Sequence, residues 1–234
     1  MAAAAFFVAL VLIVGVPGVQ GAIFGLEEAL FGRPALSPDK VRQIEGIVLT
    51  PLATLLAAFL YRWLGRNVDR AADLTPPAPP RPAGPLATAG WVVLGVALAV
   101  LGSTGLALLM QAFGAPVAEQ ALVLEIVGGA DPLRPELAIL AFSALALAPV
   151  AEELFFRRQL FGRIRRAGGP VPAYLASALL FAAFHNNLQG FIVYAWLGLV
   201  FAATYARTGR ITAAIAVHFG NNAVTLAALV VQAS

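Results

Sequence analysis

The chain has 234 residues, of which 60% are hydrophobic and only 12% are charged. Soluble domains usually carry about a quarter charged residues, so this composition excludes an ordinary soluble protein and indicates a membrane protein. The absence of cysteine excludes disulfides, thiolate metal sites and a thiol nucleophile. The net charge of +3 is small, and the basic residues lie in short clusters between apolar runs, so nucleic acid is not an expected partner.

Apolar runs near the length of a membrane span recur along the whole chain. The first run lacks a basic leader and a clean cleavage site, which favours a retained helix over a cleaved signal peptide. The fold class is therefore all-α, a polytopic helical membrane protein with about seven to eight transmembrane helices. The predicted spans are residues 4–25, 46–64, 89–113, 135–156, 171–187, 190–206 and 211–232.

Two connecting segments have compositions of their own. Residues 74–85 contain six prolines and predict an extended, semi-rigid linker. Residues 116–128 are short and amphipathic, which favours a segment lying on the membrane over one that crosses it. A re-entrant piece here would still change the number of spans.

The distribution of basic residues predicts an orientation. With seven spans and a cytoplasmic N-terminus, eleven of the 15 Lys and Arg residues fall in inside loops and four fall outside. This bias follows the positive-inside rule, so we expect an integral membrane protein whose N-terminus is cytoplasmic.

Ionisable side chains inside the spans are the strongest functional signal. A charged residue at the centre of a span costs about 2.5–3.5 kcal/mol on insertion scales, so it usually faces an interior and has a role. At about 1.5 Å per helical residue, Glu152 lies about 16 Å from the cytoplasmic end of its span, His185 about 21 Å, His218 about 12 Å and Asn222 about 18 Å. A bilayer core is about 30 Å thick, so all four approach its midplane, from three different helices.

Helical spacing separates the two adjacent glutamates. Glu153 and Arg157 are four residues apart with the acid first, the favourable order for an ion pair. Glu152 points about 100° away and has no local partner, so it is free to act as a general base. Pro149 just upstream removes a backbone hydrogen bond, and we expect a kink that leaves room for water beside Glu152.

His218 and Asn222 are also one turn apart, and their N–H groups are the donors that an oxyanion needs. Phe181 lies one turn before His185 on the same helical face. Each feature alone has a simpler explanation. A lone histidine is often a packing residue, a Glu pair near arginines is often an interfacial ion pair, and an Asn in a span often joins helices. Their common depth favours the functional interpretation.

Three motifs in order resemble the CAAX-protease and bacteriocin-processing (Abi/CPBP) family of intramembrane proteases. "EELFFR" at 152–157 resembles that family's EExxxR motif, "FAAFH" at 181–185 its FxxxH motif, and "HFGNN" at 218–222 its HxxxN motif. The resemblance covers residues 148 to about 230. It divides the chain into variable N-terminal helices, 1–130, and a protease-like catalytic core, 131–234.

The resemblance implies helices around a water-accessible intramembrane cavity and hydrolysis of a peptide bond. By it, Glu152 would activate water with help from His185, while His218 and Asn222 would stabilise the oxyanion and Glu153, Arg157 and Phe181 would support them. No cofactor is expected, because Asn222 is a poor zinc ligand and a good oxyanion donor. Zinc held by Glu152, His185 and His218 is the alternative.

The expected function is thus an intramembrane endopeptidase of a prokaryotic inner membrane, with the bilayer and a membrane-bound or lipidated peptide as partners. Two alternatives stay open. One is a non-catalytic relative that binds a partner or confers bacteriocin immunity. The other is a proton-coupled transporter, against which no paired broken helices are found in corresponding halves. The sequence does not indicate an oligomeric state.

Overall fold

The computed structural model describes residues 38–71, 82–117, 121–129 and 135–233, and this part is helical and contains no strand. The all-α prediction is therefore confirmed there. The predicted span 4–25 and most of the proline-rich linker 74–85 lie outside the described residues. The elements are α3 (Pro38–Ala71), α4 (Pro85–Ala112), α5 (Ala121–Val127), α6 (Pro135–Phe142), η2 (Ser143–Leu147), α7 (Ala148–Glu152), η3 (Glu153–Phe161), α8 (Gly162–Gly168), α9 (Pro170–Phe184), α10 (Phe191–Thr208) and α11 (Ile211–Ala233).

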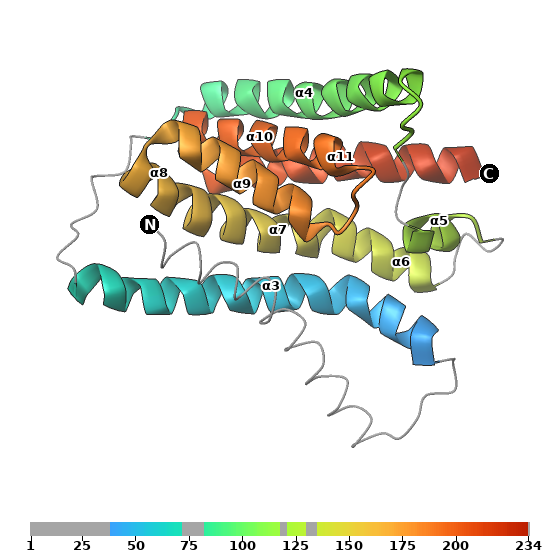
Figure 1. Cartoon of the computed structure of the whole chain (residues 1–234), viewed down its shortest axis with the longest axis horizontal. Coiled ribbons are helices and arrows are strands. Elements are labelled where there is room, and N and C mark those ends of the chain that lie inside the picture. The colour runs from blue at the N-terminus through green and yellow to red at the C-terminus, as the bar shows by residue number, and fades with distance from the viewer. Residues whose placement is uncertain (1–37, 72–81, 118–120, 130–134, 234) are drawn as a thin grey trace.

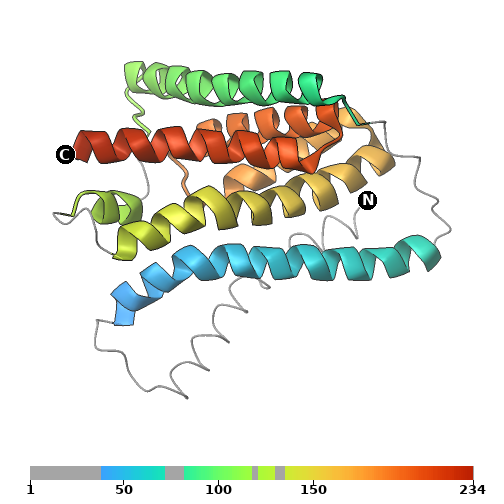
Figure 2. The ribbon, with the colours of Figure 1, turned by 180° about the vertical axis from the view of Figure 1, so that it is seen from behind.

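The long helices lie side by side along the long axis of the molecule (Figure 1). Helix α10 packs against α9, α4 and α11, while α3 packs against η2, α7 and η3 on the other side of the bundle. Seen from behind, α4, α11, the helical path that begins at α6, and α3 follow one another across the bundle (Figure 2). The motif-bearing elements α7, η3, α9 and α11 therefore lie between α3 and α4. The predicted boundary near residue 130 stays a prediction.

Residues 135–168 form one continuous helical path that is longer than the predicted span 135–156. It continues through the basic residues and ends at Gly168, where Gly169 takes a φ of 87° and Pro170 starts α9. A left-handed φ is easy for glycine and strained for other residues, so this turn is encoded locally. Pro149 lies within this path between two π-helical segments, η2 and η3, and the expected kink beside it stays a prediction.

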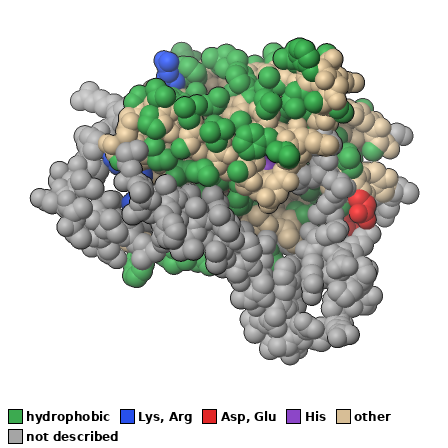
Figure 3. Space-filling view, viewed as in Figure 1, with side chains coloured by type: hydrophobic (Ala, Val, Ile, Leu, Met, Phe, Trp, Pro, Cys, Tyr) green, Lys and Arg blue, Asp and Glu red, His purple; other side chains and the backbone are tan. Residues whose placement is uncertain are grey.

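Within the described residues, four helices are long and apolar enough to cross a membrane: 85–112, 135–168, 191–208 and 211–233. The predicted spans 46–64 and 171–187 correspond to shorter apolar helices, 46–60 and 170–184. One face is mostly hydrophobic, with basic side chains toward one end (Figure 3). The chain is therefore an integral membrane protein, while the count of seven to eight helices and the N-terminal orientation stay predictions.

A proline in α3 leaves one carbonyl without its helical donor, and a hydroxyl from another helix donates to this carbonyl. Pro51 has no backbone N–H, so the carbonyl of Ile47, four residues earlier, loses its helical donor. The hydroxyl of Ser143 on η2 donates to this carbonyl at 2.5 Å. An unpaired carbonyl inside a membrane is costly, so this bond helps to fix α3 against the motif-bearing helical path.

Helices α9 and α10 approach closely at a glycine. A Cβ atom placed on Gly198 would lie 2.8 Å from the Cα of Ala178, and both residues are buried. Small residues let helix backbones approach in membranes, where apolar side chains alone give little preference for other helices over lipid. Gly198 thus sets the distance between the helix that ends at His185 and its neighbour.

We expect Gly198→Ala to destabilise the protein by about 1–3 kcal/mol, because the added methyl overlaps backbone atoms that cannot move aside. Gly105→Ala is the matched control, since a Cβ on Gly105 meets nothing within 4 Å. Its helix should gain up to about 1 kcal/mol from the better propensity of alanine. Unfolding in detergent measures both. Equal changes for the two variants would contradict the close contact at Gly198.

Candidate active site

The structure brings the motif residues to the facing sides of three helical stretches. Glu152 ends α7 and Glu153 begins η3, His185 follows the last residue of α9, and His218 and Asn222 lie one turn apart on α11. The charged groups near the His185 imidazole include Glu152 and His218. The three helical stretches that carry the motifs therefore meet, while their common depth in the membrane stays a prediction.

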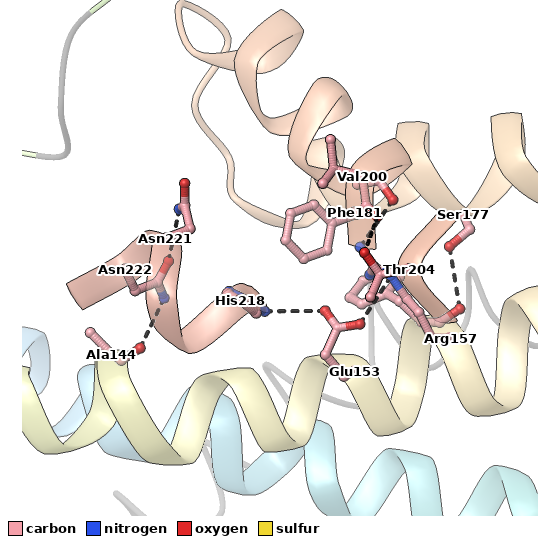
Figure 4. Close-up of polar contacts among 12 residues, drawn as sticks. Ala144, Glu153, Arg157, Ser177, Phe181, Val200, Thr204, His218, Asn221 and Asn222 are labelled. Atoms are coloured by element: carbon pink, nitrogen blue, oxygen red, sulfur yellow. Dashed lines mark hydrogen bonds and ion pairs between the residues drawn. The ribbon is translucent and has the colours of Figure 1, made fainter. Parts of the chain in front are cut away.

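Glu153 occupies the centre of the site, between a guanidinium and an imidazole (Figure 4). Its Oε2 lies 3.2 Å from Nε of Arg157, and its Oε1 lies 3.1 Å from Nδ1 of His218. The contact with Arg157 is an ion pair without hydrogen-bond alignment, since neither Nε of Arg157 nor Oε2 of Glu153 has a hydrogen-bond partner among the described residues. The predicted pair is present, and it also binds a histidine that spacing did not assign to it.

This ion pair is buried inside the helical bundle. Glu153 and Arg157 are each 0% exposed, which rules out solvent as their partner. The Nη2 of Arg157 donates to the carbonyl of Gly198 at 3.2 Å, and its guanidinium carbon lies 4.6 Å from the Phe181 ring centroid and 5.3 Å from that of Phe201. Cation–π contacts and a carboxylate therefore share the stabilisation of this buried charge.

Two contacts, a ring stack and a hydrogen bond, fix the orientation of the His218 ring. Its ring stacks on Phe201 at 4.5 Å between centroids, with 20° between the planes. Because a carboxylate accepts hydrogen bonds, the proton on Nδ1 is the one that points at Glu153. Nε2 is then the ring nitrogen that is left for another group.

His185 is fixed by its own helix and by α10. Its Nδ1 lies 2.8 Å from the carbonyl oxygen of Phe181, and since a carbonyl only accepts, Nδ1 carries the proton and Nε2 the lone pair. The Tyr194 ring stacks on the imidazole at 4.1 Å and 21°, and the Phe181 ring lies at 4.7 Å. The predicted proximity of Phe181 is confirmed, and both histidines present Nε2 as the free ring nitrogen.

Glu152 has the least engaged carboxyl group of the site. Its side chain is buried, and Oε2 has no hydrogen-bond partner among the described residues. A buried carboxylate oxygen without a partner is costly, so such a group usually has a functional reason. The expectation that Glu152 lacks the local partner that Glu153 has is thus supported.

Both the nitrogen and the oxygen of the Asn222 side-chain amide make hydrogen bonds. Its Nδ2 donates to the carbonyl of Ala144 on η2 at 2.8 Å, and its Oδ1 accepts from Nδ2 of Asn221 at 3.2 Å. Asn222 therefore does join helices, as the simpler explanation proposed. Since an amide NH₂ has two donors, one N–H remains for a ligand.

The residues give limited support to a zinc site. Across the described residues, no three His, Asp or Glu side chains are grouped as metal ligands. Both Nδ1 atoms of the histidines face oxygen acceptors, so Nε2 of each and the Glu152 carboxyl are the atoms that could bind a metal. The alternative of a zinc centre on Glu152, His185 and His218 therefore stays a prediction.

Spacing along the chain missed several residues that shape the site. Tyr194 and Phe201 stack on the two histidines, and Gly198 supplies the carbonyl that Arg157 binds. All three lie on α10, which carries no motif of its own. Aromatic residues in apolar spans are normally packing residues, so nothing in the sequence singles these out.

Comparisons with known proteins find similarity to membrane proteases in the C-terminal region. Residues 134–224 match the model of a family described as type II CAAX prenyl endopeptidase Rce1-like. The chain is 26% identical over 143 residues to the membrane-embedded CAAX protease MroQ of Staphylococcus aureus, covering 56% of this chain and 54% of MroQ. It is 34% identical over 76 residues to YdiL of Bacillus subtilis, whose name describes a membrane peptidase, covering 32% of this chain and 31% of YdiL. No solved structure matches the chain.

Proposed function

We propose that this chain, which carries a type II CAAX endopeptidase-like domain in residues 134–224, is an intramembrane endopeptidase that cleaves a membrane-associated or lipidated peptide. The observation that carries the proposal is the buried Oε2 of Glu152, which has no hydrogen-bond partner among the described residues and belongs to a carboxylate whose charge acts on the His185 imidazole. Hydrolysis of an amide requires a free base that takes a proton from water and N–H donors that stabilise the oxyanion.

In the proposed reaction the carboxylate of Glu152 takes a proton from a water molecule. The water oxygen forms a bond to the peptide carbonyl carbon, and the carbonyl π electrons move to its oxygen. The tetrahedral intermediate then re-forms its C=O bond and breaks the C–N bond, and the leaving nitrogen receives the proton from Glu152. General-base assistance of this kind contributes about 10²–10⁴ in rate.

His185 would orient the attacking water. Its Nδ1 proton is committed to the Phe181 carbonyl, so Nε2 can accept a hydrogen bond from the water while Glu152 removes the other proton. Stacking against Tyr194 restricts the ring, so the acceptor direction is set before substrate binds.

His218 and Asn222 would stabilise the oxyanion. With Nδ1–H held on Glu153, a His218 imidazolium would donate its Nε2–H to the developing charge. Asn222 would donate the N–H that Ala144 does not use. In this scheme Glu153 and Arg157 act through His218, which is why Glu153 is a positioning residue and Glu152 the base.

The test is cleavage of defined probes by the purified full chain in lipid nanodiscs. One probe is a quenched fluorescent peptide on a transmembrane anchor, and the other is the same peptide ending in a farnesylated CAAX sequence. We expect cleavage of at least one, and no loss of activity with 1,10-phenanthroline, because no three His, Asp or Glu side chains of the described residues are grouped as metal ligands. Loss with the chelator and recovery with zinc would overturn the metal-free mechanism.

The same experiment separates the alternative functions. A non-catalytic partner-binding protein would bind these probes without cleaving them. A proton-coupled transporter would instead acidify or alkalinise the interior of proteoliposomes in a manner that depends on Glu152. A Glu152-dependent change of pH inside the proteoliposomes, without cleavage of either probe, would favour transport and contradict the protease proposal.

A further inference from the structure

The most informative contact outside the ionisable groups is the bond from Asn222 to Ala144. Ala144 lies in η2, where the backbone follows the π-helical pattern in which an N–H bonds the carbonyl five residues earlier. The N–H of Ala148 bonds the carbonyl of Ser143 in this register. The next donor in the series would be residue 149, and its acceptor would be the carbonyl of Ala144.

Residue 149 is a proline, which has no N–H. The backbone therefore cannot supply the bond to Ala144 at this register, and the preceding donor, Ala148, is already used by Ser143. The side chain of Asn222 from α11 donates to Ala144 instead, at 2.8 Å (Figure 4). The buried Pro149 thus creates the acceptor that the Asn222 amide occupies.

We propose that Pro149 is a positioning residue that holds the Asn222 amide in its productive orientation by leaving the Ala144 carbonyl without a backbone donor. The proposal rests on the proposed oxyanion role of Asn222 and adds the part of the chain that sets its geometry. Asn221 completes the arrangement, since its Nδ2 donates to Oδ1 of Asn222 and opposes a flip of the amide. One Asn222 N–H is fixed on Ala144, and the direction of the other follows from the planarity of the amide.

The alternative is that Asn222 only joins helices and that Pro149 only interrupts the series of backbone hydrogen bonds in its own helix. The two readings differ in what Pro149→Ala does. An alanine returns the N–H at position 149, which competes with Asn222 for the Ala144 carbonyl. If Pro149 acts through Asn222, the variant should gain thermal stability and lose catalysis, because the amide is released from its anchor.

The first experiment is a stability cycle that does not depend on activity. We expect Pro149→Ala to raise the melting temperature in detergent, and to raise it more in the Asn222→Ala background, where the Ala144 carbonyl has lost its side-chain donor. Equal increases in both backgrounds, or failure of Pro149→Ala to fold, would overturn the proposal. The cycle tests the link between Pro149 and the Asn222 contact even if the wild-type chain cleaves neither probe, so a failure of this link and a failure of the proposed function can be told apart.

The second experiment repeats the cycle with the fluorescent probe that the wild type cleaves. We expect Pro149→Ala to lower kcat by about tenfold to hundredfold with KM little changed, as for a misplaced catalytic group. In the Asn222→Ala background it should have no further effect. Pro172→Ala is the matched control, because this proline lies in the first turn of α9, where a restored N–H has no helical carbonyl to bind. An unchanged kcat in Pro149→Ala, or equal losses in the two proline variants, would refute the proposal.

Discussion

Replacement of Glu152 by glutamine is expected to lower kcat by about 10²–10⁴ while leaving the fold intact. Glutamine keeps the shape of the side chain and cannot accept a proton from water. It also removes a buried charge whose Oε2 has no partner among the described residues, so stability should be unchanged or slightly higher. Cleavage of the anchored fluorescent peptide and thermal unfolding in the same detergent give the two readouts.

Two matched variants make this result specific. Glu136→Gln lies on α6 of the same helical path, outside the motif cluster, and should leave both readouts unchanged. Glu153→Gln should lower stability as well as activity, because it leaves Arg157 buried beside a neutral amide. Undiminished cleavage by Glu152→Gln would rule out Glu152 as the base. Loss of activity without loss of stability in Glu153→Gln would assign that role to Glu153 instead.

Arg157→Ala is expected to destabilise the protein by about 3–5 kcal/mol, the usual cost of leaving one member of a buried ion pair without its partner. The guanidinium faces Glu153, the Gly198 carbonyl and the rings of Phe181 and Phe201, and all of these contacts are lost together. The free energy of unfolding in detergent measures the effect. Arg158→Ala, the exposed neighbour on the same helix, should change it by less than about 0.5 kcal/mol.

A double variant shows whether charge or volume explains that loss. In Glu153→Gln with Arg157→Met both charges are gone, so we expect the protein to recover much of the stability that either single variant loses. Activity should not recover, since His218 then lacks the carboxylate that orients its ring. Additive losses in the double variant would show that the pair contributes packing alone.

Rules that act within one helix predicted a large part of the site. The four-residue spacing placed Glu153 beside Arg157, and the same spacing placed the Phe181 carbonyl and ring beside His185. The composition gave the membrane class, and positions relative to span ends gave a common depth for Glu152, both histidines and Asn222. These properties depend only on helical geometry and on the cost of placing polar groups in lipid, so a single sequence determines them.

Contacts between helices were decided by the tertiary structure. The sequence assigned Glu153 to Arg157 alone, and the fold added His218 because α11 packs against η3. Likewise Pro149 was expected to remove a backbone hydrogen bond, and the structure shows which side chain is near the gap, since the Asn222 amide donates to the Ala144 carbonyl in the π-helical segment η2. Which faces of two helices meet depends on close approaches such as Gly198 on Ala178, and these involve residues far apart in the chain. Periodicity fixes which side chains share a helix face, whereas the rotation of each helix against its neighbours is set by packing, and that rotation selects which carboxylate binds the histidine.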